Sequence, residues 1–81
     1  MKKIDIITQQ YPDEEFLKAD GFDDAIIGID KDFRVCYSIT KCVQILTKDM
    51  TEDDATDYFW FNVAGSYVGD KTPIFVDEIL V

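Results

Sequence analysis

The stretch that decides the predicted fold runs from Tyr58 to Val68 and reads Tyr-Phe-Trp-Phe-Asn-Val-Ala-Gly-Ser-Tyr-Val. It contains five of the eleven aromatic residues of the chain. At about 100° per residue, apolar side chains occupy both sides of the helix that it predicts, and only Asn62 and Ser66 form a polar strip. A helix that is apolar almost all round needs cover on several sides, so we expect a central helix in a domain with one core.

The flanking residues predict where this helix begins and ends. Thr51-Glu52-Asp53-Asp54 resembles a capping box and places carboxylates in the first turn, where they favour a helix N-terminus. Gly69 ends the helix, and Pro73 prevents it from resuming. Ile74-Phe75-Val76 then predicts a final strand.

The middle of the chain changes period. Ala25–Ile29 and Phe33–Tyr37 are rich in β-branched and aromatic residues, and Asp30-Lys31-Asp32 between them has turn chemistry, so we expect a hairpin. Ser38 is suited to cap the next helix, whose apolar stripe runs from Ile39 to Met50 at three- and four-residue spacing.

The N-terminal quarter gives weaker signals. Pro12 suits a first helical position, acids follow it, and Gly21 closes the segment, so the pattern predicts a short helix from Pro12 to Ala19. Residues 1–11 fit either a short strand or a frayed helical start. The expected order is α-β-β-α-α-β. Residues 1–81 then form one α+β domain, in which a three-stranded antiparallel sheet (hairpin plus C-terminal strand) packs on the central aromatic helix with two further helices.

Charge and cysteine content narrow the classes of partner and compartment. Seventeen acids against eight bases give a net charge of −9, and histidine is absent. Direct binding to nucleic acid or to an anionic membrane is therefore disfavoured, and a basic protein partner is favoured. No stretch reaches membrane-spanning length. Cys36 and Cys42 are too few for a disulfide framework, so we expect free thiols in a reducing cytoplasm.

Catalytic and cofactor motifs do not emerge from the residues. Neither a nucleophile with its base, nor a phosphate-binding glycine loop, nor zinc-ligand spacing occurs, so we expect neither enzyme activity nor a cofactor. The acids between Asp20 and Asp32 lack the spacing of a calcium loop and are typical of turns and caps, so we expect no metal site. Cys42 falls on an apolar helix stripe and is expected in the core.

A candidate partner-binding surface combines acids with an aromatic anchor. Trp60 follows closely after Asp53, Asp54 and Asp57, and aromatic side chains with a charged rim are typical of interface centres. The same pattern is explained by a solvated acidic face that binds no partner, with all the aromatic side chains packed in the core. The predicted partner-binding residues are Asp20, Asp23, Asp24, Asp30, Asp32, Asp53, Asp54, Asp57 and Trp60.

Two blocks of sequence resemble a known group of proteins. Gly21-Phe22-Asp23-Asp24-Ala25-Ile26-Ile27-Gly28 is followed by the block from Tyr58 to Gly69 with Thr72-Pro73-Ile74-Phe75. These blocks are similar to those of a family of short, uncharacterised tailed-phage and prophage proteins. The resemblance implies a phage or prophage origin and action in the bacterial host cytoplasm. It carries over no functional residue.

Three hypotheses of function follow. The first is a small phage accessory protein that binds a basic host or phage protein, with inhibition of a host defence or nucleic-acid-binding enzyme by a DNA-mimicking surface as its specific form. The second is a structural module that completes its burial in a homodimer. The third is an enzyme or small-molecule binder, which needs a concave site that no motif indicates.

Overall fold

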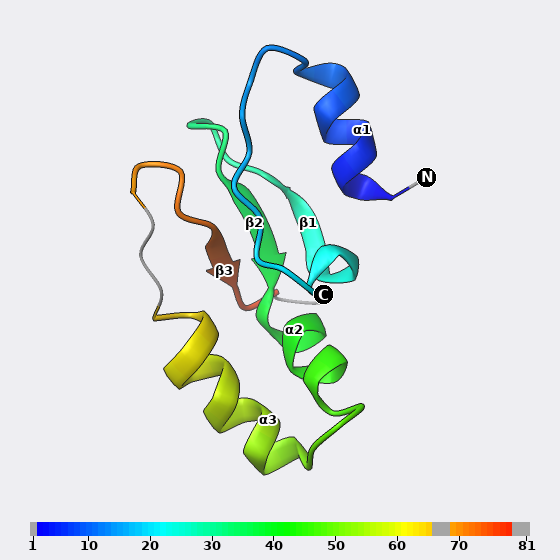
Figure 1. The fold of residues 1–81 in the computed structure, drawn as a ribbon, viewed down its shortest axis with the longest axis vertical. Helices are drawn as coiled ribbons and strands as arrows, with labels where there is room; N and C mark the ends of the chain where they lie inside the picture. The colour runs from blue at the N-terminus through cyan, green and yellow to red at the C-terminus, as the bar shows by residue number, and fades with distance from the viewer. Residues whose placement is uncertain (1, 66–68, 79–81) are drawn as a thin grey trace.

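The computed structural model describes residues 2–65 and 69–78, in which helices and a three-stranded sheet follow the predicted order (Figure 1). A 3-10 turn, η1, precedes the sheet, and a π-helical turn, η2, continues the third helix. The α+β class and the element order are confirmed. The bounds are α1 Lys3–Gln10, η1 Asp23–Ala25, β1 Ile26–Ile29, β2 Val35–Ser38, α2 Ile39–Leu46, α3 Glu52–Tyr58, η2 Phe59–Val63 and β3 Ile74–Val76.

The predicted hairpin is confirmed. β1 pairs antiparallel with β2, with Ile26 opposite Tyr37 and Ile29 opposite Val35, and the register shifts between Ile26 and Gly28. Phe33, expected in the second strand, lies in the turn instead. Its N–H donates to the Asp30 carbonyl over 3.1 Å, and its φ of 62° is a left-handed conformation that is uncommon for a bulky residue.

The third strand joins the sheet as predicted, but its direction was predicted wrongly. β3 pairs with β2 in parallel, with Tyr37 opposite Phe75, and the strand order is β1-β2-β3. Parallel neighbours need a crossover connection of a dozen or more residues. α2, α3 and η2 lie within this crossover, and residues 69–71 lie beside the hairpin turn before β3 begins (Figure 1).

The first helix was also predicted in the wrong place. Lys3–Gln10 is helical, which resolves the open choice for residues 1–11, whereas residues 14–19 are irregular. Ile4 and Ile7, one turn apart, are buried against the core and provide the apolar face of α1. The segment after Pro12 instead runs extended along the sheet, where the Ala19 N–H reaches the Tyr37 hydroxyl over 2.7 Å. Tertiary contact here outweighs local helix signals.

Both predicted N-caps are present. The Ser38 side chain accepts from the Lys41 N–H, and the Thr51 side chain accepts from the Asp54 N–H, each over 3.2 Å. They fix the starts of α2 and α3, which lie side by side as an antiparallel pair below the sheet (Figure 1).

The core is centred on the middle strand rather than on the aromatic helix. Val35 and Tyr37 of β2 are fully buried, together with Ile26, Cys42 and Phe59. The Tyr37 ring lies 5.4 Å from that of Phe75, which in turn meets Phe59 edge-on at 5.3 Å. This row of aromatic rings attaches the end of α3 to the sheet.

The expected cover around the aromatic helix is absent from the described residues. Phe59 is fully buried, and Val63 and Ala64 pack partly buried against the core, whereas Trp60 is 53% exposed and Phe61 is 83% exposed. The helix therefore lies at the edge of the domain, with one side against the core and the other in water. The predictions for Ser66, Tyr67 and Val68 lie outside the described residues.

The Tyr37 hydroxyl gives a direct test of this packing. Tyr37→Phe keeps the ring but leaves the Ala19 N–H without its acceptor, so we expect a loss of about 1–2 kcal/mol in the free energy of unfolding. Urea denaturation followed by circular dichroism measures it. Tyr11→Phe is the matched control, because Tyr11 is exposed and its ring contact with Phe33 is retained. Equal midpoints for Tyr37→Phe and the wild type would show that this hydrogen bond contributes nothing.

Candidate functional site

One exposed surface combines aromatic rings with carboxylates along α3 and η2. We call it the α3–η2 surface and define it by Asp53, Asp54, Asp57, Tyr58, Trp60 and Phe61. All six side chains are exposed. Asp57 lies one turn before Trp60 and Phe61, and Asp53 lies one turn before Asp57, so acids and rings follow each other along the helix. This arrangement offers an apolar anchor with a negatively charged rim.

The π-helical turn positions these rings. The Ala64 N–H donates to the Phe59 carbonyl over 2.9 Å, which is a bond across five residues. Phe59 is fully buried, whereas Phe61, two residues further along and on the opposite side of the helix, projects into water. Trp60 rests edge-on against Phe59 at 5.3 Å, so its indole is partly held in place. Such turns are rare within helices and often occur at functional sites.

Beside this surface lies an open groove of about 470 Å³. Residues 18–22 form one wall, and residues from the ranges 45–49, 58–63 and 73–75 form the rest. Its lining combines apolar side chains with a few polar and charged ones at exposed positions. The lining residues are Lys18, Ala19, Asp20, Gly21, Phe22, Ile45, Leu46, Asp49, Tyr58, Asn62, Val63, Pro73 and Phe75. We call it the Asp20–Asp49 groove after its two carboxylates.

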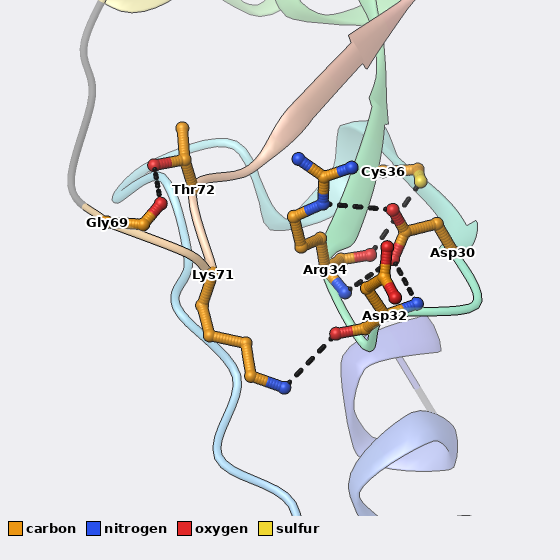
Figure 2. A network of polar contacts seen from close by, with 7 residues as sticks. All are labelled: Asp30, Asp32, Arg34, Cys36, Gly69, Lys71 and Thr72. Carbon is orange, nitrogen blue, oxygen red and sulfur yellow. Dashed lines mark hydrogen bonds and ion pairs between the residues drawn. The ribbon is translucent and has the colours of Figure 1, made fainter.

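The hairpin turn holds a separate polar network, which Figure 2 shows. The Asp30 carboxylate accepts three hydrogen bonds: from the Asp32 N–H over 3.0 Å, from the Arg34 N–H over 2.8 Å and from the Arg34 side chain over 3.0 Å. Lys71 reaches the Asp32 carbonyl over 3.2 Å and the Glu14 carboxylate over 3.5 Å. The network thus ties the turn to two distant segments.

Electrostatics in this network follow from its hydrogen bonds. The backbone N–H of Arg34 is the main cause that lowers the pKa of Asp30 from its ordinary 3.8, and the Arg34 side chain and the Asp32 N–H add to it against partial desolvation. Lys71 also lies 5.3 Å from the centre of the Phe33 ring, which offers its negative face to the cation. Asp30 therefore serves the turn as a structural acceptor.

A second hollow, of about 420 Å³, lies next to this network. Asp32, Arg34, Gly69, Asp70 and Lys71 line it. Its two cations face two carboxylates, so the lining favours a ligand of neither sign.

The predicted partner-binding residues fall into three groups. Asp53, Asp54, Asp57 and Trp60 lie together on the α3–η2 surface. Asp20 lines the groove, while Asp23 pairs with Lys18 at 3.5 Å and Asp24 is exposed beside it on η1.

Asp30 and Asp32 belong to the hairpin turn, which lies at the other end of the long axis from the start of α3 (Figure 1). The acids of the two ends therefore do not share one patch.

Some residues of these sites were not singled out from the sequence. Tyr58 and Phe61 were assigned to the faces of a covered helix, although their position directly after a run of acids could have marked them as exposed. Asp49 was not among the predicted partner-binding residues. It lines the groove because residues 18–22 fold against α2 and α3, and no local sequence pattern predicts that contact.

The described residues were also compared with the requirements of a metal site, a membrane span and a disulfide. Within residues 2–65 and 69–78, no three His, Cys, Asp or Glu side chains are grouped closely enough to hold a metal ion. In the same ranges, no helix has both the length and the apolar character needed to cross a membrane. Both cysteines are free thiols: Cys42 is buried, as predicted, and Cys36 is half-buried.

Comparison with known proteins adds no relative: no protein-family model matches the chain, no curated protein matches it, and no solved structure matches it.

The lowered pKa of Asp30 predicts a pH-dependent stability. A folded-state pKa below the unfolded value stabilises the fold fully above about pH 3.8, and that contribution is lost as the pH falls through the folded-state pKa. We expect Asp30→Asn to lower the urea midpoint at pH 7. In urea titrations below pH 3.8, the difference in midpoint between the variant and the wild type should become smaller.

Asp24→Asn removes the same charge from an exposed position on η1 and is the control for charge alone. A gap between Asp30→Asn and the wild type that stays constant from neutral to acid pH would contradict the stabilising role of the ionised carboxylate.

The two thiols should differ in reactivity. Burial raises the pKa of Cys42 to about 11, and burial followed by the charge of Asp30 raises the pKa of Cys36. Because the thiolate is the reactive form, we expect slow alkylation of Cys36 in the native protein at pH 8 and alkylation of Cys42 only after unfolding. Iodoacetamide labelling read by mass spectrometry, with and without denaturant, measures both rates. Native-state labelling of Cys42 as fast as that of Cys36 would contradict the packing described above.

Proposed function

We propose that this protein acts by binding another protein that presents a basic surface, and that the α3–η2 surface is its docking site. The observation that carries the proposal is the exposure of Phe61, at 83%, and of Trp60, at 53%, directly after the carboxylates of the same helix. Large aromatic side chains left in water beside one another are typical of surfaces that become buried in a complex.

The chemistry of the surface indicates the sign of the partner. Asp53, Asp54 and Asp57 form its charged rim, and the whole chain carries a net charge of −9. A negative rim speeds association with a basic surface and disfavours acidic partners. The aromatic rings, once the partner buries them, supply most of the binding energy. A partner with exposed lysines and arginines around an apolar pocket fits both requirements.

Nucleic-acid-binding enzymes are one class of protein with such basic surfaces. In its specific form, the proposal is that the α3 carboxylates occupy part of a cleft built for phosphates and so inhibit the enzyme. The resemblance to phage and prophage proteins supports a host enzyme, including a defence enzyme, and action in the bacterial cytoplasm. The separation of the acid groups limits any such mimicry to the α3 end of the molecule.

Affinity capture from bacterial lysate, followed by salt-dependent binding to the recovered protein, tests the proposal. We expect Trp60→Ala with Phe61→Ala to weaken binding by about tenfold or more, because aromatic anchors are frequent hot spots. We expect Asp53→Asn with Asp57→Asn to slow association at low salt, with a smaller effect at high salt.

Matched controls separate the site from bulk properties. Leu17→Ala removes an exposed apolar side chain elsewhere, and Asp13→Asn with Glu15→Gln removes two exposed charges from another segment. Equal weakening by either control would show that net charge or overall apolarity, rather than the α3–η2 surface, drives binding. Recovery of no partner protein would overturn the proposal.

The same exposed rings support a second candidate function, a homodimer that buries Phe61 and Trp60 against a second copy. Light scattering across a dilution series distinguishes the two. A dimer at low concentration whose formation protects the Trp60 fluorescence from acrylamide favours self-association, whereas a monomer with a readily quenched Trp60 favours the heterologous partner.

A further inference from the structure

We propose that the Asp20–Asp49 groove binds one arginine side chain of the basic partner, with its guanidinium beside the two carboxylates and its aliphatic part on the apolar lining. This inference rests on the proposed function and specifies the chemistry of the partner. The groove has about 470 Å³ of open volume, within the range of pockets that hold small ligands and ample for one long side chain.

The charges of the groove favour a cation. Lys18 is its one basic lining residue, and its ammonium group lies 3.5 Å from the Asp23 carboxylate, which offsets its charge. Asp20 and Asp49 have no ion-pair partner in the part of the chain that the structure describes. Two uncompensated carboxylates in one groove attract a single cationic group from a partner.

The apolar lining suits the rest of an arginine side chain. Phe22, Leu46 and Val63 offer hydrocarbon surface to three methylene groups, and burial of such stems beside a charged head is common. Tyr58 and Phe75 also line the groove, and the flat guanidinium stacks on aromatic faces more readily than an ammonium does. These features favour arginine over lysine.

The position of the groove connects it to the docking surface. Tyr58 lines the groove and also belongs to the α3–η2 surface, so the two are continuous along one helix. A partner seated on Trp60 and Phe61 therefore has the groove within its footprint. Continuity and charge together indicate a side chain of the docked protein as the occupant.

Titration of the isotope-labelled protein with N-butylguanidinium, followed by NMR chemical shifts, tests the groove without any partner. N-butylurea is the matched probe, because it has the same shape without the charge. We expect guanidinium-dependent shifts that cluster at the groove. Asp20→Asn and Asp49→Asn should each weaken the guanidinium affinity by roughly threefold to fivefold, as removal of one partly exposed charge pair does.

Asp13→Asn and Glu15→Gln remove equal charge from exposed positions outside the groove and should leave the probe affinity unchanged. Equal binding of the urea and the guanidinium probes, shifts centred on another surface, or equal weakening by the control variants would overturn the arginine site. Both groove variants replace exposed carboxylates by isosteric amides, and the NMR spectrum of each free variant verifies that it is folded.

Partner binding then identifies the source of the arginine. The double variant Asp20→Asn with Asp49→Asn should weaken partner binding by about tenfold. When one interface arginine of the partner is replaced by lysine, the double variant and the wild type should bind that partner with equal affinity. Wild-type partner affinity in the double variant would overturn the inference while leaving the α3–η2 surface intact. Failure of the proposed function would instead appear as a partner affinity that the Trp60 and Phe61 substitutions leave unchanged.

Discussion

The contact between Tyr37 and the Ala19 backbone organises three parts of the chain that are distant in sequence. The tyrosine ring is fully buried in the middle strand, and its hydroxyl accepts the Ala19 N–H over 2.7 Å. Its ring also contacts Phe75 on β3, and Phe75 in turn contacts Phe59 of η2. One side chain thus sets the positions of the extended N-terminal segment, the third strand and the helix with the exposed rings.

Burial explains why this contact is costly to lose. A backbone N–H that is removed from water needs an acceptor, and the tyrosine hydroxyl is the acceptor that the sheet offers to this segment. Since residues 18–22 form one wall of the Asp20–Asp49 groove, the same hydrogen bond attaches that wall to the sheet. The binding proposals therefore depend on a bond that lies in the core.

The sequence predicted the elements whose causes are local. Turn chemistry at Asp30 to Asp32 and the caps at Ser38 and Thr51 act within a few residues, and all of them occur as predicted. The errors concern contacts across the chain. The helix expected after Pro12 is replaced by an extended segment because Tyr37 and the core fix its course, and β3 runs parallel because its connection returns along the sheet.

The candidate sites show the same limit. Composition indicated a basic partner, but it could not distinguish Asp30, whose hydrogen bonds hold a turn, from Asp57, which faces solvent on a helix. Amphipathic periodicity assumed that every apolar face becomes covered within one chain. The aromatic segment breaks that assumption, because Phe59 is buried while Trp60 and Phe61 are left in water. The groove joins four stretches of chain between Lys18 and Phe75, and no local pattern reveals that they meet.

The parallel pairing of β3 has a consequence for the nascent and partly folded chain. β1 and β2 form a hairpin from neighbouring residues, whereas β3 reaches β2 only after α2 and α3 have folded back. Until then, the strand that bears Val35 and Tyr37 has an open edge with unpaired backbone groups, and such edges recruit strands from other molecules. Strand exchange between copies and aggregation compete with the last step of folding, and high concentration favours both.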